Sequence, residues 1–320
     1  MRSMSRRVAL LAAVVVLAAC APGARAAVRH GGSVPSPPAA ASGPGCAPTA
    51  GLARRTLSEP GTGGSPAVRT YQLHVPRGLP AGSRVPLLVS LHGLGASGTI
   101  QNAITGWSSF DDAQAAAGAP FVLALPDGLA TLWFWGVEDS YDVRFVFDVV
   151  ADIEASDCVD ASRIYVDGWS EGAFMAQRMA CASGDPAVDP RGTVVAAIHS
   201  YAGGDPGIAL PQSCQPQRGK APGPAVLLSQ GLDDTLVDPR KLGFPAFTAW
   251  GARYSCRPAA AAYTEAQQLA GCSDGVLVAW WPIRGFGHLT WSCPADPSWH
   301  NRGIWQFFTR RTAPTATACS

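Results

Sequence analysis

A glycine-flanked serine stands between two regular elements at residues 168–172, which read Gly-Trp-Ser-Glu-Gly. The segment 163–167 before it is typical of a short buried strand, and the segment 173–180 after it is typical of a helix. A strand, this turn and a helix form a nucleophile elbow, in which strained backbone angles hold the serine hydroxyl above the edge of a sheet. We therefore predict that Ser170 is a nucleophile.

A serine nucleophile needs a general base, and histidine suits that role near neutral pH. Of the six histidines, His288 has the most suitable place, because it ends the loop 285–288 (Gly-Phe-Gly-His) shortly after a predicted strand. Such a loop lies at the carboxyl edge of a parallel sheet, where Ser170 also lies. His300 is the alternative candidate for the base.

The base needs an acid to orient its ring, and two neighbouring aspartates follow another apolar run. The run 225–230 leads into residues 231–237, which contain Asp233 and Asp234. Aspartate also stabilises turns, so either residue could serve only the local backbone. Since adjacent side chains point in different directions, we expect only one of the two to orient the imidazole.

Backbone N–H groups must stabilise the oxyanion that forms when serine attacks a carbonyl. The Glu171 N–H, directly after the nucleophile, is the first candidate. The second is the Leu94 N–H, because residues 91–95 (Leu-His-Gly-Leu-Gly) follow an apolar strand and Gly93 lets the backbone approach closely. Loss of one such donor costs on the order of 3 kcal/mol in comparable sites.

Composition indicates a well-buried globular protein without a basic surface. Hydrophobic residues make up 47% of the 320 residues, charged residues 15%, and the net charge is +1. No basic run could neutralise a phosphate backbone, so we expect no nucleic-acid partner. We predict no metal site either, because neither a Cys-x-x-Cys pair nor clustered histidines are present.

The first 26 residues are typical of a signal peptide. Three arginines precede the apolar segment 8–19, which is too short to span a bilayer comfortably. Residues 17–20 (Leu-Ala-Ala-Cys) resemble a lipobox, which would leave a lipid anchor at Cys20. Residues 24–26 (Ala-Arg-Ala) resemble a site that would release the protein instead. Both alternatives predict export, to the exterior or to the cell envelope of a bacterium.

The cysteine count agrees with export. Either processing route leaves eight cysteines, an even number that predicts disulfides. They allow 105 complete pairings, and Cys256 with Cys272 is our best local prediction. The eight are Cys46, Cys158, Cys181, Cys214, Cys256, Cys272, Cys293 and Cys319.

Alternating strand and helix patterns predict the fold class. Residues 27–66 are rich in Ala, Gly, Pro and Ser and read as a disordered tether, and residues 312–320 read as a tail. Between them, residues 67–311 predict one α/β domain with a doubly wound, mostly parallel sheet. Strands are expected at 68–75, 85–92, 121–126, 163–168, 194–200, 225–230 and 276–283, and helices around 143–153 and 304–308.

Together these segments resemble the extracellular esterases grouped with polyhydroxybutyrate depolymerases and feruloyl esterases, which are carbohydrate esterase family 1 and its relatives. The resemblance covers residues 68–308 and implies the α/β-hydrolase fold, a serine esterase and no cofactor. The family pattern Gly-x-x-Asp-x-x-Val selects Asp234 over Asp233, and Gly-x-Gly-His selects His288. The resemblance rests on Leu91-His92-Gly93, Pro126-Asp127-Gly128, residues 160–166, residues 168–172, Gly231-x-x-Asp234-x-x-Val237 and Gly285-x-Gly287-His288.

The resemblance implies an ester substrate, and the sequence leaves its identity open. Feruloyl or acetyl esters of plant cell-wall polysaccharide are the first expectation, and a polyhydroxyalkanoate is the alternative. We expect Trp169, His92 and Trp291 to contact the substrate, although most of the ten tryptophans should be core residues. The chain departs from the family at Glu171 and Gln230, where Asn or Ala and His are usual. An acyltransferase and a non-catalytic surface lipoprotein with this fold are further alternatives.

Overall fold

A nine-stranded sheet forms the centre of the computed structural model, which describes residues 49–60, 66–79, 82–134, 141–186, 188, 191–205, 214 and 223–319. The strand order is β1-β2-β4-β3-β5-β6-β7-β9-β8, and the neighbours from β4 to β9 are parallel. The strands are β1 (Gly51–Pro60), β2 (Pro66–Val75), β3 (Val85–Leu91), β4 (Val122–Pro126), β5 (Val159–Trp169), β6 (Ala197–Tyr201), β7 (Ala225–Gly231), β8 (Gln267–Gln268) and β9 (Val278–Ile283).

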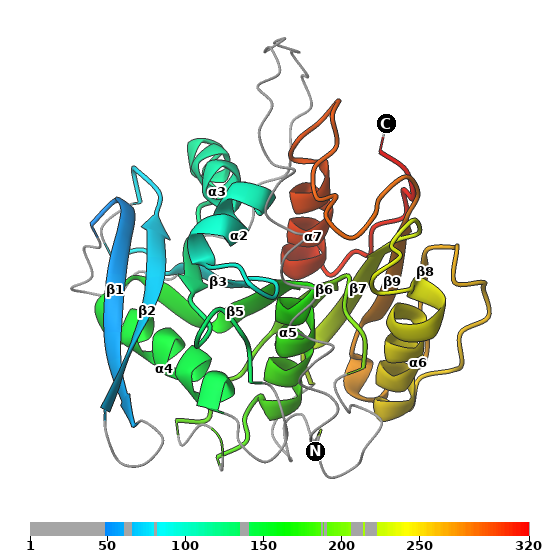
Figure 1. The fold of residues 1–320 in the computed structure, drawn as a ribbon, viewed down its shortest axis with the longest axis horizontal. Coiled ribbons are helices and arrows are strands. Elements are labelled where there is room, and N and C mark those ends of the chain that lie inside the picture. Colours follow the sequence, from blue (N-terminus) through cyan, green and yellow to red (C-terminus); the bar gives the residue numbers. More distant parts are fainter. Residues whose placement is uncertain are drawn as a thin grey trace. The chain divides into compact units, whose positions relative to one another are not determined.

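Helices cover both faces of this sheet, which explains why the central strands are continuous apolar runs. Alternate residues of one strand serve opposite faces. Leu87 and Val89 of β3 belong to the core cluster that includes residues of α4, α5 and α6, whereas Leu88 belongs to the cluster that includes residues of α3 and α7. Figure 1 shows α4 and α5 beside each other on the first face. The helices are α2 (Gly98–Thr105), α3 (Trp107–Ala116), α4 (Tyr141–Ser156), α5 (Glu171–Ala182), α6 (Phe244–Arg253) and α7 (Trp299–Arg310), with the shorter η2 (Pro239–Gly243) and η3 (Ser273–Gly275).

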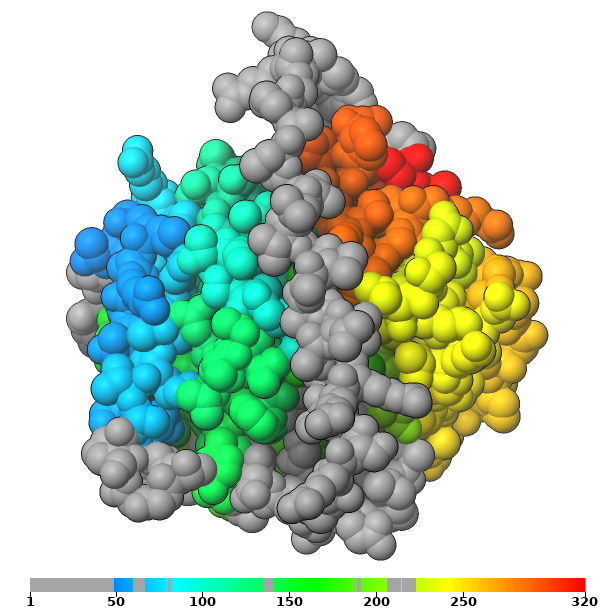
Figure 2. Space-filling model, viewed as in Figure 1, coloured from blue at the N-terminus to red at the C-terminus, as the bar shows by residue number. Residues whose placement is uncertain are grey.

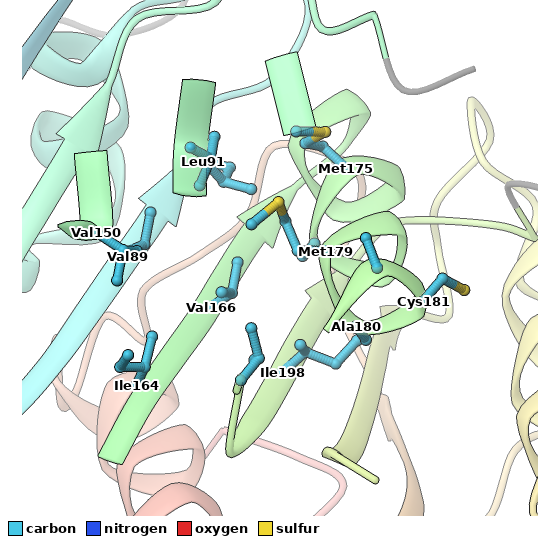
Figure 3. Close-up of a cluster of buried hydrophobic side chains, with 14 of the residues drawn as sticks. Val89, Leu91, Val150, Ile164, Val166, Met175, Met179, Ala180, Cys181 and Ile198 are labelled. Atoms are coloured by element: carbon cyan, nitrogen blue, oxygen red, sulfur yellow. The ribbon is translucent and has the colours of Figure 1, made fainter. Parts of the chain in front are cut away.

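The core under α5 fixes the helix that begins directly after Ser170. Met179 of α5 points toward Val166 of β5 (Figure 3). Met175 of α5 and Ile198 of β6 belong to the same core cluster, and all four side chains are fully buried. Burying a side chain of this size stabilises the fold by about 1.5–3 kcal/mol. The helix is therefore anchored along its length, and its first turn is held at the sheet edge.

The beginning of the fold differs from the prediction of a tether over residues 27–66. Gly51–Pro60 form β1, which pairs antiparallel with β2 over its whole length. Arg55 of β1 also pairs with Asp157, at 2.6 Å, and so connects this edge strand to the end of α4. The tether prediction is corrected for these ten residues, whereas residues 1–48, with the predicted signal peptide and Cys20, lie outside the described residues.

The C-terminal segment is also held more closely than a free tail. The Arg284 N–H donates to Thr317 O at 2.7 Å, and the Trp281 indole donates to Ala316 O at 2.7 Å. Figure 2 shows β1 and β2, in blue, and the yellow and orange residues of the C-terminal third at opposite sides of the face in view, which agrees with their places in the strand order.

Three disulfides join described cysteines. Cys256 bonds Cys272, as predicted, and the other two bonds are Cys181–Cys214 and Cys293–Cys319. Cys158 is disulfide-bonded too, and Cys46 lies outside the described residues. Among the helices of the described chain, none has the length and apolar character needed to cross a bilayer.

Candidate active site

The elbow that the sequence predicts is present at the junction of β5 and α5. Ser170 follows the last residue of β5, and α5 begins at the next residue. The Ser170 backbone has φ 56° and ψ −121°, a conformation that residues other than glycine rarely adopt. A Cβ on Gly168 would lie 2.1 Å from Gly172 O, and a Cβ on Gly172 would lie 2.2 Å from Leu91 O. Only glycine fits on either side of the serine, which explains the spacing of the motif.

Ser170, His288 and Asp234 are joined by a continuous chain of hydrogen bonds. The Ser170 Oγ lies 2.8 Å from His288 Nε2, and His288 Nδ1 lies 2.9 Å from Asp234 Oδ2. The three side chains come from loops after β5, β9 and β7, which are parallel strands, so their carboxyl ends share one edge of the sheet. With Nδ1 donating to the carboxylate, Nε2 is free to accept the serine proton.

The carboxyl group of Asp234 is fixed by three further hydrogen bonds. Its Oδ1 accepts the N–H groups of Leu236 and Val237, both at 2.9 Å, and its Oδ2 also accepts from Gln230 Nε2 at 2.9 Å. Asp234 is 4% exposed. Asp233 is exposed and has no side-chain contact with His288 among the described residues. Gln230, at which the sequence departs from the pattern of the esterases that it resembles, thus helps to hold Asp234.

The predicted oxyanion loop, residues 91–95, lies against Ser170. A Cβ on Gly93 would lie 3.2 Å from Ser170 Cβ and 2.9 Å from the Trp169 ring, so glycine permits this close approach. The N–H groups of Leu94 and Glu171 have no hydrogen-bond partner within the described part of the chain. Both donors therefore remain available to a substrate oxygen.

His92 supports this loop and does not face a substrate, which corrects the prediction of a substrate contact. Its side chain is fully buried; Nε2 accepts the Gly128 N–H at 2.9 Å, and Nδ1 lies 2.8 Å from Gly93 O. Burial lowers the pKa of His92, so the ring is neutral and Nδ1 donates to the carbonyl. The Trp133 ring lies 4.7 Å from the His92 ring at a tilt of 36°, and its indole N–H donates to His92 O at 2.7 Å.

The Glu171 side chain points toward Trp133, which also contacts His92. Its Oε2 accepts the Trp133 N–H at 3.2 Å. Burial is the main cause that raises the pKa of Glu171 to about 7; the charge of Asp142 adds to the rise, and the hydrogen bond from Trp133 opposes it. Around neutral pH this carboxyl group is therefore partly protonated, which reduces the negative charge beside Ser170.

Two tryptophans predicted to contact substrate are instead almost fully buried. Trp169 is 3% exposed and donates its indole N–H to His288 O at 2.7 Å. Trp291 is also 3% exposed, and its indole donates to Asn301 Oδ1 at 2.8 Å. Trp169 borders the site between the oxyanion loop and His288, whereas the indole of Trp291 belongs to the core under it.

A second Asp–His–Ser arrangement lies in the core. His199 Nδ1 is 2.7 Å from Asp167 Oδ1, and His199 Nε2 is 2.6 Å from Ser229 Oγ, with all three residues at most 1% exposed. His300, the alternative base, lies 3.5 Å from Ser229 Oγ, and burial lowers its pKa well below 6.5. The alternative is therefore not favoured, because His300 contacts Ser229 and is sealed from solvent.

The described residues hold no group of three or more His, Cys, Asp and Glu side chains arranged for a metal ion.

No family model matches the chain. Among curated proteins, a bifunctional acetylxylan esterase/xylanase of Neocallimastix patriciarum is 27% identical over 108 residues, 34% of this chain and 15% of that protein. "Putative esterase NocK" of Nocardia uniformis subsp. tsuyamanensis is 30% identical over 193 residues, 56% of this chain and 54% of that protein. The matches thus span about half or less of these relatives.

Solved structures are similar to the chain over most of its length. An acetyl xylan esterase from Aspergillus awamori superposes with a TM-score of 0.54 at 14% identity, covering 80% of this chain and 98% of that one. A thermostable esterase gives 0.53 at 17% identity, with coverage of 81% and 62%. An S-formylglutathione hydrolase from Staphylococcus aureus gives 0.50 at 12%, with coverage of 82% and 99%. Together with the parallel sheet and the elbow, these similarities confirm that the chain has the α/β-hydrolase fold.

Proposed function

We propose that the protein is a serine carboxylic-ester hydrolase in which Ser170, His288 and Asp234 form the catalytic triad. The observation that carries the proposal is the unbroken chain of hydrogen bonds from Ser170 Oγ through both ring nitrogens of His288 to Asp234. Ser170 is only partly buried, so its hydroxyl is accessible. Esterases among the sequence relatives and the structural neighbours agree with this activity.

In the proposed reaction, Ser170 Oγ attacks the ester carbonyl carbon while His288 Nε2 accepts its proton. Asp234 holds the tautomer in which Nδ1 carries a proton, and it stabilises the imidazolium that forms. The tetrahedral intermediate collapses as Nε2 gives its proton to the leaving alcohol oxygen. Water then attacks the acyl-enzyme with His288 again as base, which releases the acid and restores the serine.

The oxyanion is bound by the N–H groups of Leu94 and Glu171 in this mechanism. Their positions follow from two independent facts, the contact of Gly93 with Ser170 and the place of Glu171 at the start of α5. The N-terminus of a helix carries partial positive charge, so α5 adds to the stabilisation of a negative oxygen. The Glu171 N–H and the start of α5 are fixed before substrate binds, because β5 and α5 are anchored in the core.

The first candidate substrate class is acetyl or feruloyl esters of plant cell-wall polysaccharide. The names of one sequence relative and one structural neighbour, both acetylxylan esterases, support it. A second candidate, an aliphatic polyester such as polyhydroxybutyrate, is favoured by exposed leucines beside the triad. Leu289 adjoins His288 and is 46% exposed, and Leu236 follows Asp234 by two residues and is 53% exposed.

Export is part of the proposal. The N-terminal pattern and the disulfides among the described residues both suit an oxidising compartment. Lipid attachment at Cys20 and release after Ala26 are distinguished by mass spectrometry of the mature N-terminus. A diacylglycerol adduct on Cys20 would show attachment, and a free N-terminus at Ala27 would show release.

A fluorophosphonate probe tests the triad directly. We expect it to label the wild-type protein at Ser170 and to leave Ser170→Ala unlabelled. Ser229 is the internal control, because it also contacts a histidine but is 1% exposed. Labelling mapped to any other residue, or no labelling of a folded protein, would refute the proposed nucleophile and favour a non-catalytic protein with this fold.

A substrate panel then separates the candidate classes. Methyl ferulate, acetylated xylan and polyhydroxybutyrate are given to the purified wild type and to Ser170→Ala. Release of ferulate or acetate by the wild type alone supports the polysaccharide esters, and release of hydroxybutyrate alone supports the polyester. Transfer of the acyl group to an added alcohol in preference to water would indicate an acyltransferase.

A further inference from the structure

The loop that carries His288 has no regular secondary structure, yet it must hold Nε2 at hydrogen-bonding distance from Ser170 Oγ. Two buried side chains fix successive carbonyl oxygens of this loop. The Tyr201 hydroxyl donates to Gly287 O at 2.5 Å, and the Trp169 indole donates to His288 O at 2.7 Å. Buried side chains therefore hold the backbone carbonyl oxygens on both sides of the proposed base, those of Gly287 and His288.

Tyr201 contacts the nucleophile as well as the base. It is the last residue of β6, and its own carbonyl oxygen accepts the Ser170 N–H at 2.9 Å. One residue thus bonds the backbone of the elbow through its main chain and the backbone of the histidine loop through its side chain. The distance between these two attachment points is set by one tyrosine side chain, which is rigid apart from two torsions.

Packing leaves that side chain little freedom. Tyr201 is fully buried, and its ring meets the rings of Trp291 and His300 edge-on, at centroid distances of 5.4 and 5.2 Å. Burial raises the pKa of its hydroxyl well above 10, and the charge of Asp234 acts in the same direction. The hydroxyl therefore remains a donor throughout the pH range in which an esterase works.

We propose that Tyr201 is a positioning residue that sets the distance between the nucleophile Ser170 and the base His288. The inference rests on the proposed serine-hydrolase function and adds a residue outside the triad and the oxyanion loop. Without the hydroxyl, Gly287 O loses its donor, and of the two side-chain bonds to the carbonyls of Gly287 and His288 only that from Trp169 remains. A misplacement of about 1 Å between reacting groups can lower a rate by about 100-fold.

The test compares Tyr201→Phe with Tyr254→Phe, a matched control elsewhere in the fold. Tyr254 is also buried, and its hydroxyl also donates to a backbone carbonyl, that of Pro224, at 3.3 Å. We expect both variants to lower the Tm by a similar amount, about 2–6 °C, because each loses one such hydrogen bond. Only Tyr201→Phe should lower kcat for p-nitrophenyl acetate, by about 10- to 100-fold, with KM changed less than about twofold.

The rate of inactivation by a fluorophosphonate gives a second readout, since it measures the reactivity of Ser170 without turnover. It should fall with kcat in Tyr201→Phe and stay at the wild-type value in Tyr254→Phe. Unchanged kcat and labelling in Tyr201→Phe, or equal losses in both variants, would overturn the positioning role. A wild type that neither turns over esters nor reacts with the probe would instead refute the proposed function.

Trp169→Phe keeps the inference testable if Tyr201→Phe does not fold. This variant removes the other donor to the loop, so it should also slow labelling of Ser170. Where both single variants fold, their double variant should slow labelling by a factor that differs from the product of the two single factors, because both act on one loop. A simple product would overturn the shared role.

Discussion

Replacing Glu171 with glutamine removes a carboxyl group that the fold makes costly to ionise. Its pKa rises from 4.5 to about 7, chiefly through burial. Each pKa unit corresponds to about 1.4 kcal/mol, so the ionised group destabilises the folded state by about 3 kcal/mol. Because the side chain is partly exposed, solvent screening makes this figure an upper bound. Glutamine keeps an oxygen that can accept the Trp133 N–H but carries no charge.

The sign of the effect follows from the direction of the shift. An acid whose pKa is higher in the folded than in the unfolded state destabilises the fold as it ionises. For Glu171 the penalty is absent below pH 4.5, grows between pH 4.5 and about 7, and is complete above that. The free energy of unfolding of Glu171→Gln, minus that of the wild type, should therefore rise by up to about 3 kcal/mol between about pH 4.5 and 8.

Urea unfolding of both proteins at several pH values in that window measures the difference. Other groups with raised pKa values, such as Asp111 at about 8, titrate in both proteins and cancel. In a domain of this size, 1 kcal/mol corresponds to about 2–4 °C in Tm, so thermal scans give an independent check. Glu265→Gln, at an exposed site, is the control and should show no such trend. A constant difference across the pH range for Glu171→Gln would refute the reasoning.

Three further predictions concern the acid, the oxyanion loop and one disulfide. Asp234→Asn should lower kcat by about 10⁴-fold, because the wrong histidine tautomer is then favoured, whereas Asp233→Asn should stay within about twofold in the same esterase assay. Gly93→Ala should lower kcat by more than tenfold, on the order of the loss of one oxyanion donor, since its Cβ would meet the elbow at 2.9–3.2 Å; an unchanged kcat would exclude the loop from the site. Replacing Cys256 and Cys272 together with serine should lower the free energy of unfolding by about 3 kcal/mol, measured by urea denaturation, and an unchanged midpoint would contradict this.

The central strands and the fold class could be predicted from the sequence, and the first strand could not. β3 and β7 are continuous apolar runs because helices cover both of their faces, and such runs are visible in a sequence. In β1 only alternate side chains, such as Arg55 and Leu57, are half-buried, and the strand is held mainly by backbone pairing to β2. Composition alone therefore made it look like part of the tether.

The sites of Ser170, Asp234 and His288 could be predicted from chain order, but the roles of the surrounding residues could not. His92 and Trp291 stand near site residues in the sequence, and nothing in their residue types distinguishes a substrate contact from a supporting one. Burial and hydrogen-bond partners decide that question, and both are set by segments far away, such as Gly128 for His92 and Asn301 for Trp291. Tyr201 carried no sequence signal at all, because it ends one more apolar strand.

The two Asp–His–Ser hydrogen-bond networks of this protein show what turns such a network into a candidate active site. Their hydrogen bonds are nearly equal, at 2.7 and 2.6 Å around His199 and at 2.9 and 2.8 Å around His288. Ser229, however, lies inside β7 at 1% exposure, where neither a substrate nor a helix N-terminus can reach it. Ser170 stands at a positive φ at the start of α5, beside the N–H groups of Leu94 and Glu171, which have no partner among the residues that the structure describes. Both hydrogen-bond networks contain the same residue types, so the reactivity proposed for Ser170 must come from the strained turn and the oxyanion donors around it. These features in turn depend on the glycines that flank the serine.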